Sequence, residues 1–209
     1  MFLTPQQFQA QDRFFEDTLA FRFAASLFAN WGVTECEIDS EALENGAFRL
    51  TEINPDQYVL DIQNLPEEFY VKSARLGDVD ALENGIGLTG GAPAQLQIVV
   101  GGTAAGIVGS VKGADGVGVA EAVVALVPQE AARQKQPLFY RSSKTDPPGN
   151  FQFTGLIPGE YKVYAWTQVD GEPWFSAEFL RPLESKGKSV TLRDGSSQTV
   201  ELRVIPAEQ

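Results

Sequence analysis

Short runs of alternating apolar and polar residues fill the C-terminal half of the chain, which predicts β-strands joined by tight turns. Tyr161, Val163 and Ala165 are expected on one face of such a strand, and the residues between them on the other. The run EAVVALVP at 121–128 is apolar almost throughout, which favours a buried strand that ends at Pro128. About seven short strands at this spacing predict a mainly β fold, an antiparallel β-sandwich.

Turn residues punctuate these runs at regular intervals. Asp115-Gly116 and Asp194-Gly195 are each typical of a hairpin, because Asp-Gly readily adopts the positive φ of a tight turn. Asp146 and Gly149 are expected at a turn before the next strand. Asp146 could ligate calcium, but an Asp that caps its own turn is the simpler interpretation.

The chain contains an internal repeat. Gly46–Ile62 and Gly149–Ala165 share a pattern 103 positions apart, and Ile86–Val100 aligns with Val190–Val204 at an offset of 104. The second copy also has a front half, Gly106–Pro148, which the first copy lacks. The repeat therefore predicts one complete and one partial copy of the same β module.

The N-terminal segment has a different pattern. Thr4, Pro5 and Gln7 form a helix start, and a wide apolar face rich in Phe follows as far as Gly32. We expect an amphipathic helix and then a strand over 33–39. The predicted domains are thus 1–45, a partial module over 46–102 and a complete β-sandwich over 103–209.

Composition excludes several function classes. The net charge of −12 argues against nucleic acid and anionic membranes as partners. No apolar run is long enough for membrane insertion, and the start does not read as a signal peptide, so the chain as written is expected in the cytoplasm. Cys36 is the only cysteine, and there is no histidine, the commonest general base and zinc ligand. We therefore expect no enzyme, no catalytic residues, no cofactor and no metal.

Three aromatic residues are the candidate ligand-binding site. Trp166, Trp174 and Phe175 could form a platform on which a sugar ring stacks, or they could pack in the core or between domains. Glu67-Glu68 could act as paired carboxylates, but nothing fixes a partner for them, and a solvated turn is the simpler interpretation. The expected partner is a glycan or a protein.

The series TDPPGNFQFTGLIPGEYKVYAW at 145–166, with the Asp115-Gly116 turn before it, resembles the carboxypeptidase regulatory-like domain. This resemblance covers Gly106–Ile205 and extends more weakly over 46–209. It implies an immunoglobulin- or transthyretin-like sandwich with a carbohydrate-binding-like fold and no catalysis of its own. The C-terminal segment is similar to the last such domain of large bacterial envelope proteins, which implies an accessory or binding domain of an extracytoplasmic parent protein.

The first 50 residues resemble a second family. MFLTPQQFQAQDRFF, Trp31-Gly32 and Glu37-Ile38-Asp39 are similar to the N-terminus of TssK, the trimeric cytoplasmic baseplate component of type VI secretion systems. This resemblance implies the alternative function, a fragment of a secretion scaffold that can recruit another protein. The switch between the two families falls at Gly46–Leu50, where a natural or an artefactual join would produce a chimera.

Overall fold

The computed structural model describes residues 55–62, 65–89 and 95–206. The predicted helix and strand of the N-terminal segment lie outside these residues. The described residues fall into two compact units. The smaller contains 55–62, 65, 85–89 and 95, and the larger contains Pro66–Asn84 and the chain from Leu96 onward. The domain boundaries drawn from the repeat stay a prediction.

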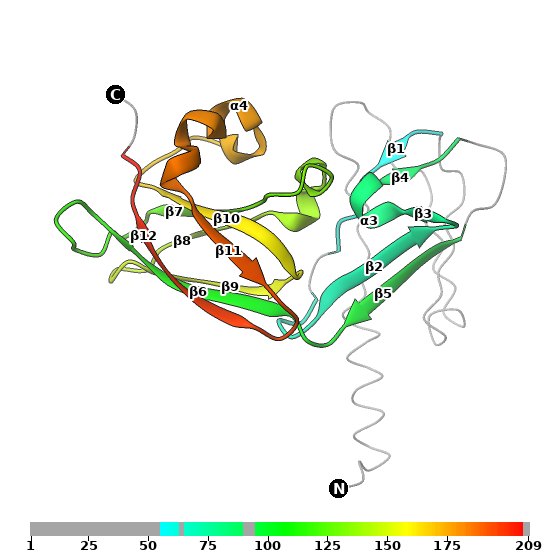
Figure 1. Cartoon of the computed structure of the whole chain (residues 1–209), viewed down its shortest axis with the longest axis horizontal. Coiled ribbons are helices and arrows are strands. Elements are labelled where there is room, and N and C mark those ends of the chain that lie inside the picture. Colours follow the sequence, from blue (N-terminus) through cyan, green and yellow to red (C-terminus); the bar gives the residue numbers. More distant parts are fainter. Residues whose placement is uncertain (1–54, 63–64, 90–94, 207–209) are drawn as a thin grey trace, which may run out of the picture. The chain divides into compact units, whose positions relative to one another are not determined.

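Two sheets form a β-sandwich in the larger unit (Figure 1). The antiparallel four-stranded sheet has the order β11 (Lys188–Leu192), β10 (Gly159–Trp166), β7 (Val123–Pro128) and β8 (Arg141–Lys144). The three-stranded sheet has the order β12 (Ser197–Arg203), β6 (Ala105–Lys112) and β9 (Asn150–Leu156). In this second sheet β12 runs parallel to β6, and β9 runs antiparallel to it. The predicted β-sandwich is confirmed, with one parallel pair in an otherwise antiparallel fold.

The alternation read from β10 is also confirmed. Tyr161, Val163 and Ala165 are each 1% exposed or less and are paired with the inward-facing residues of β7. Ile107 and Val111 of β6 are equally buried. The inner faces of the two sheets therefore supply the core by the period-two pattern of a sandwich.

The outer face of the four-stranded sheet is covered as well. The segment between β10 and β11 forms three short helical turns, η3 (Pro173–Phe175), α4 (Ala177–Leu180) and η4 (Arg181–Lys186). In Figure 1 this segment lies on the side of the sheet that faces away from β6 and β9. We call it the helical cap. Because both faces of β7 are covered, its run is apolar without alternation.

A smaller sheet in the same unit belongs to the partial copy. It has the order β3 (Val79–Asp80), β2 (Tyr70–Leu76) and β5 (Leu96–Gly101), and the short helix α3 (Ala81–Asn84) follows β3. Tyr70 donates a hydrogen bond from its hydroxyl to Asp194 in the turn between β11 and β12. Gln136, which lies in the β7–β8 connection, donates to the backbone carbonyl of Glu83 over 3.3 Å.

The smaller unit reproduces the strand register of the complete copy. Its β1 (Gln57–Tyr58) pairs antiparallel with β4 (Ile86–Gly87), placing Tyr58 opposite Ile86. In the complete copy, β10 pairs with β11 so that Tyr161 lies opposite Val190. These are the residues that the repeat aligns, at offsets of 103 and 104. The residues that the repeat aligns thus occupy equivalent positions in a strand pair in both copies.

One predicted hairpin is wrong. A turn does form at Asp194-Gly195, where Gly195 has a φ of +63°. The flanking strands, however, join different sheets, since β11 pairs with β10 and β12 pairs with β6. The turn therefore crosses from one layer of the sandwich to the other.

The turn at Asp146 and Gly149 has the expected role. The Asp146 carboxylate accepts hydrogen bonds from the backbone N–H and side-chain amide of Asn150. Gly149 has a φ of +89°, and a Cβ there would lie 2.8 Å from the carbonyl oxygen of Val111. The backbone thus requires glycine at this repeat position. Among the described residues, no group of three acidic or cysteine side chains could hold a metal ion.

Candidate ligand-binding pocket

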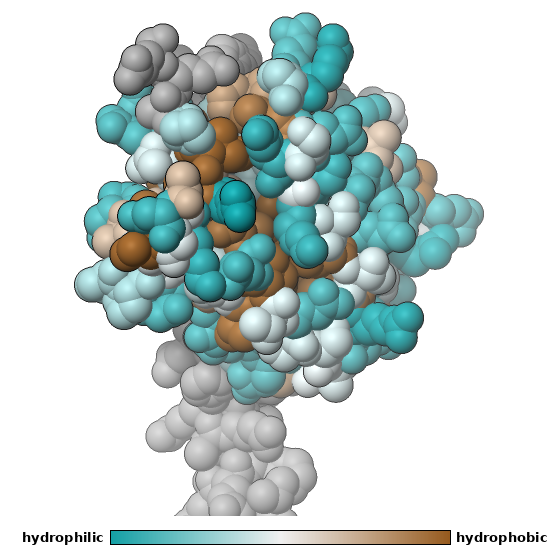
Figure 2. Space-filling view, turned by 60° about the vertical axis from the view of Figure 1, so that its left-hand side comes forward, coloured by the Kyte–Doolittle hydropathy of each residue, from teal (hydrophilic) through white to brown (hydrophobic). Residues whose placement is uncertain are grey.

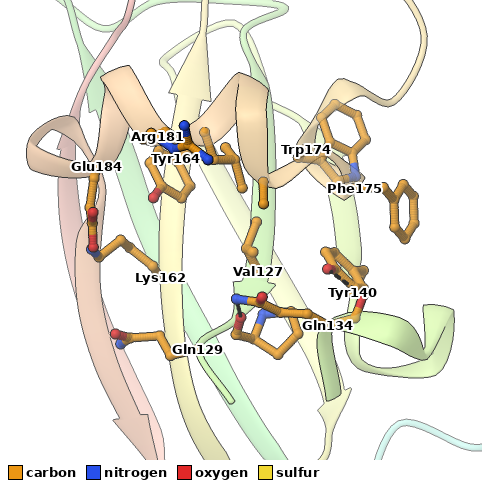
Figure 3. Close-up of a pocket in the computed structure, with 13 residues that line it drawn as sticks. Val127, Gln129, Gln134, Tyr140, Lys162, Tyr164, Trp174, Phe175, Arg181 and Glu184 are labelled. Atoms are coloured by element: carbon orange, nitrogen blue, oxygen red, sulfur yellow. Dashed lines mark hydrogen bonds and ion pairs between the residues drawn. The ribbon is translucent and has the colours of Figure 1, made fainter. Parts of the chain in front are cut away.

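A pocket of about 300 Å³ lies between the four-stranded sheet and the helical cap (Figure 3). Its floor comes from the outward-facing residues of β7 and β10, and the cap supplies the opposite wall. The lining is partly aromatic and partly polar, with contributions from Gln129, Gln134, Tyr140, Lys162, Tyr164, Trp174, Phe175, Arg181 and Glu184. Aromatic side chains with a few placed polar groups are typical of small-molecule pockets.

Aromatic stacking holds the helical cap on the sheet. Trp166 stacks on Tyr164 at 5.6 Å between ring centroids and on Trp174 at 6.0 Å. Phe179 of the cap packs on the same indole at 6.0 Å. Ser176 begins α4 by accepting a hydrogen bond from the backbone N–H of Phe179. The alternation along β10 therefore builds a second apolar cluster outside the sandwich core.

The three predicted site residues lie in one region but differ in exposure. Trp166 and Trp174 are 3% and 4% exposed, whereas Phe175 is 43% exposed. Trp174 and Phe175 line the pocket, and Trp166 lies beneath Trp174 in the cluster. The Phe175 ring contacts the Tyr140 ring at 4.3 Å. Ligand binding by these residues stays a prediction, and Phe175 is the ring of the three that solvent reaches most.

The polar lining was not found from the sequence. The side-chain amides of Gln129 and Gln134 each donate over 3.0 Å to a backbone carbonyl, that of Tyr161 and that of Pro128 respectively. Their side-chain oxygens accept no hydrogen bond from the described residues. Both residues follow β7 in the sequence. Their place in the pocket depends on the pairing of β7 with β10, which the local sequence does not show. Each amide group is therefore held in place, and its side-chain oxygen can accept a hydrogen bond from a ligand.

Charges at the other end of the pocket come from three side chains. Lys162 of β10 lies 3.4 Å from Glu184 of the cap. Arg181 is exposed and forms no ion pair with a described residue. In Figure 3 the Tyr164 hydroxyl points into the same space as Lys162 and Glu184. A ligand can thus meet a guanidinium, a phenol and an ion pair here.

Both tyrosines of the pocket are held as neutral phenols. Burial raises the pKa of Tyr140 to about 12, and its hydroxyl donates to the backbone carbonyl of Gln134 over 3.0 Å. Burial, and secondarily the nearby Glu184 carboxylate, also raises the pKa of Tyr164. Both phenols therefore stay protonated at neutral pH.

Glu67 and Glu68 lie outside this pocket, in the turn that precedes β2. Both are exposed, as expected for a solvated turn. The backbone carbonyl of Glu68 accepts a hydrogen bond from the N–H of Ala104 over 2.9 Å.

The N-terminal resemblance is confirmed by comparison with protein families. A model of bacterial type VI secretion proteins, described by the names EvfL, ImpJ and VasE, matches residues 7–72, which is less than half of the chain. The match extends past Leu50 into β2. No curated protein sequence matches the chain.

Solved structures similar to this chain are β-rich proteins with low sequence identity. A candidate carbohydrate-binding protein from Pseudomonas aeruginosa is 18% identical, with 48% of this chain and 88% of that one aligned and a TM-score of 0.34. The major pilin subunit BcpA of Bacillus cereus is 11% identical over 68% of this chain and 57% of that one, with a TM-score of 0.31. The alignment with the Bacillus anthracis TIE protein, 12% identical with a TM-score of 0.33, spans 53% of this chain and only 19% of that protein.

The helices that the structure describes are all too short or too polar to cross a bilayer. On the face of the molecule seen in Figure 2, hydrophilic residues predominate and apolar ones form a central strip between them.

Proposed function

We propose that the chain is a non-catalytic β-sandwich binding domain whose pocket under the helical cap holds a saccharide. The proposal rests on one observation: the exposed ring of Phe175 and the fixed side-chain amides of Gln129 and Gln134 line the same pocket. A sugar ring presents an apolar face that can stack on an aromatic ring and hydroxyl groups at its edge. The pocket offers partners for both.

The absence of reactive pairs supports a binding role over an enzymatic one. Glu184 is the one carboxylate in the pocket lining, and it is paired with Lys162. The tyrosine hydroxyls remain protonated at neutral pH because burial raises their pKa. General acid–base chemistry needs a second titratable group near the working pH, and this lining does not supply one. Hydrolysis of a bound oligosaccharide by the purified protein would contradict this part of the proposal.

Titration calorimetry with oligosaccharides of glucose, xylose, mannose and N-acetylglucosamine tests the site. We expect one class to bind, and Phe175→Ala to weaken that binding about fivefold or more, since stacking of a nucleic-acid base on an aromatic ring is worth about 1–3 kcal/mol and we take a sugar ring to be similar. Val117→Ala is the matched control, because Val117 is 63% exposed and lies outside the pocket. Binding that survives Phe175→Ala unchanged, or no binding by any class, would overturn the pocket assignment.

The parent protein is proposed to be a larger envelope protein, as the resemblance of the C-terminal module implies. The alternative, a fragment of a type VI secretion scaffold, is favoured by the family match over residues 7–72. Cell fractionation and native mass distinguish the two. An exported protein with glycan affinity supports the binding domain, and a cytosolic trimer without it supports the scaffold. Sequencing genomic DNA across codons 30–70 tests whether the two segments belong to one natural gene.

A further inference from the structure

Among the residues that the structure describes, strand β5 has one unpaired edge. It pairs antiparallel with β2, and no strand among the described residues pairs with its other side. The last strand of the complete copy, β12, pairs with β6, the leading strand of its own module. The sequence of the partial copy has no such leading half, and β2 is the one strand that pairs with β5 among the described residues.

The strand at this edge carries neither of two features that commonly prevent strands from pairing with other chains, a charged side chain or a proline. Val99 and Val100 are 42% and 39% exposed and, as neighbours in a strand, point to opposite faces of the sheet. No residue from Asn84 to Val111 carries a charge, and β5 itself contains no proline. Edge strands of monomeric proteins are commonly protected by lysine, proline or a covering element. An uncharged strand that exposes valines on both faces is a template for another strand.

We propose that β5 is the contact between two copies of this chain, paired antiparallel across a twofold axis. In a symmetric register a residue of β5 lies opposite the same residue of the other copy, as Val99 opposite Val99, and the two small sheets join into one. A twofold contact must be self-complementary. A neutral, apolar strand satisfies this condition, because it brings no like charges together even though each copy carries a net charge of −12. This inference is independent of the saccharide pocket.

Sedimentation velocity on the full chain over a range of concentrations tests the dimer. We expect a dimer whose dissociation constant falls as NaCl is raised from 0.05 to 0.5 M, because salt screens the repulsion between the two acidic copies. Val99→Lys should weaken association at least tenfold by placing two like charges against each other across the new pair. Val108→Lys is the matched control. Val108 is 39% exposed, but its strand β6 is paired on both edges by β12 and β9, so a charge there leaves association unchanged.

Hydrogen exchange on the unmodified protein gives a second readout that needs no substitution. Amides of β5 that face the free edge should exchange more slowly as protein concentration rises, while those of β6 should not change. A monomer at all concentrations, a trimer, a dimer that persists in Val99→Lys, or exchange in β5 that is independent of concentration would overturn the proposal.

Discussion

The two copies of the module share a strand register but differ in burial. Tyr58 and Tyr161 are equivalent in the repeat and occupy equivalent places in a strand pair. Tyr161 is 1% exposed and donates a hydrogen bond to the carbonyl of Ile157 over 2.8 Å, whereas Tyr58 is only partly buried. The difference follows from the front half, because β6 and β7 of the complete copy cover and extend the pair. The repeat residues thus set the register, and the leading strands supply the core.

The largest expected effect comes from a cavity in the complete copy. Leu126 of β7 is 0% exposed between the sheets. Leu126→Ala should lower the free energy of unfolding by about 3 kcal/mol, because it removes buried methyl groups and leaves a void. Urea unfolding measures this value, and Val108→Ala on the exposed face should change it by less than about 1 kcal/mol. A loss below about 1 kcal/mol for Leu126→Ala would show that the core does not depend on the front half.

A second prediction uses the buried tyrosine of the complete copy. Burial raises the pKa of Tyr161 to about 12, above its value of about 10 in an unfolded chain. The neutral phenol is therefore favoured by the fold. The corresponding stability is fully present below pH 10 and is lost as the pH rises to 12, on the order of 2–3 kcal/mol.

Urea unfolding at several pH values between 8 and 11.5 measures this loss. Tyr161→Phe should lose less stability over the alkaline part of the range, since it has no phenol to ionise. An identical pH profile for the two proteins would contradict the assignment of the loss to Tyr161.

The smallest effect concerns a buried hydroxyl that joins two segments of the front half. Thr145 is 2% exposed, accepts from the backbone N–H of Ala122 over 2.9 Å and donates to the carbonyl of Val119 over 2.6 Å. Thr145→Val keeps the shape but leaves two backbone groups unpaired, which should cost about 1–2 kcal/mol in thermal or urea unfolding. Thr191→Val on the exposed side of β11 serves as the control and should change stability by about 0.5 kcal/mol or less. Equal stability of Thr145→Val and the unmodified protein would sink this interpretation.

The alternation along the strands and the turn residues predicted most of the fold. The faces of β10, the buried run of β7 and the turn at Asp146 follow from local patterns. The partners of β11 and β12 did not, because a turn at Asp194-Gly195 is equally compatible with a hairpin and with a crossing between sheets.

The pocket was harder to predict than the fold. The aromatic residues pointed to the region, but the polar lining depends on which strands lie side by side. The helical cap had local signals, namely Pro173 at a helix start and Ser176 as a cap, with Phe179 and Leu183 as an apolar face. Its position over β10 depends on contacts between residues far apart in the sequence, which the local periodicity does not predict.

The central claim is that the complete copy is a folding unit and that the partial copy depends on strands it does not have. Urea unfolding of two fragments, 103–209 and 46–102, followed by circular dichroism, tests it most directly. We expect a cooperative transition for 103–209 and no cooperative transition for 46–102. An unfolded 103–209 fragment, or a cooperative transition in 46–102, would contradict the account.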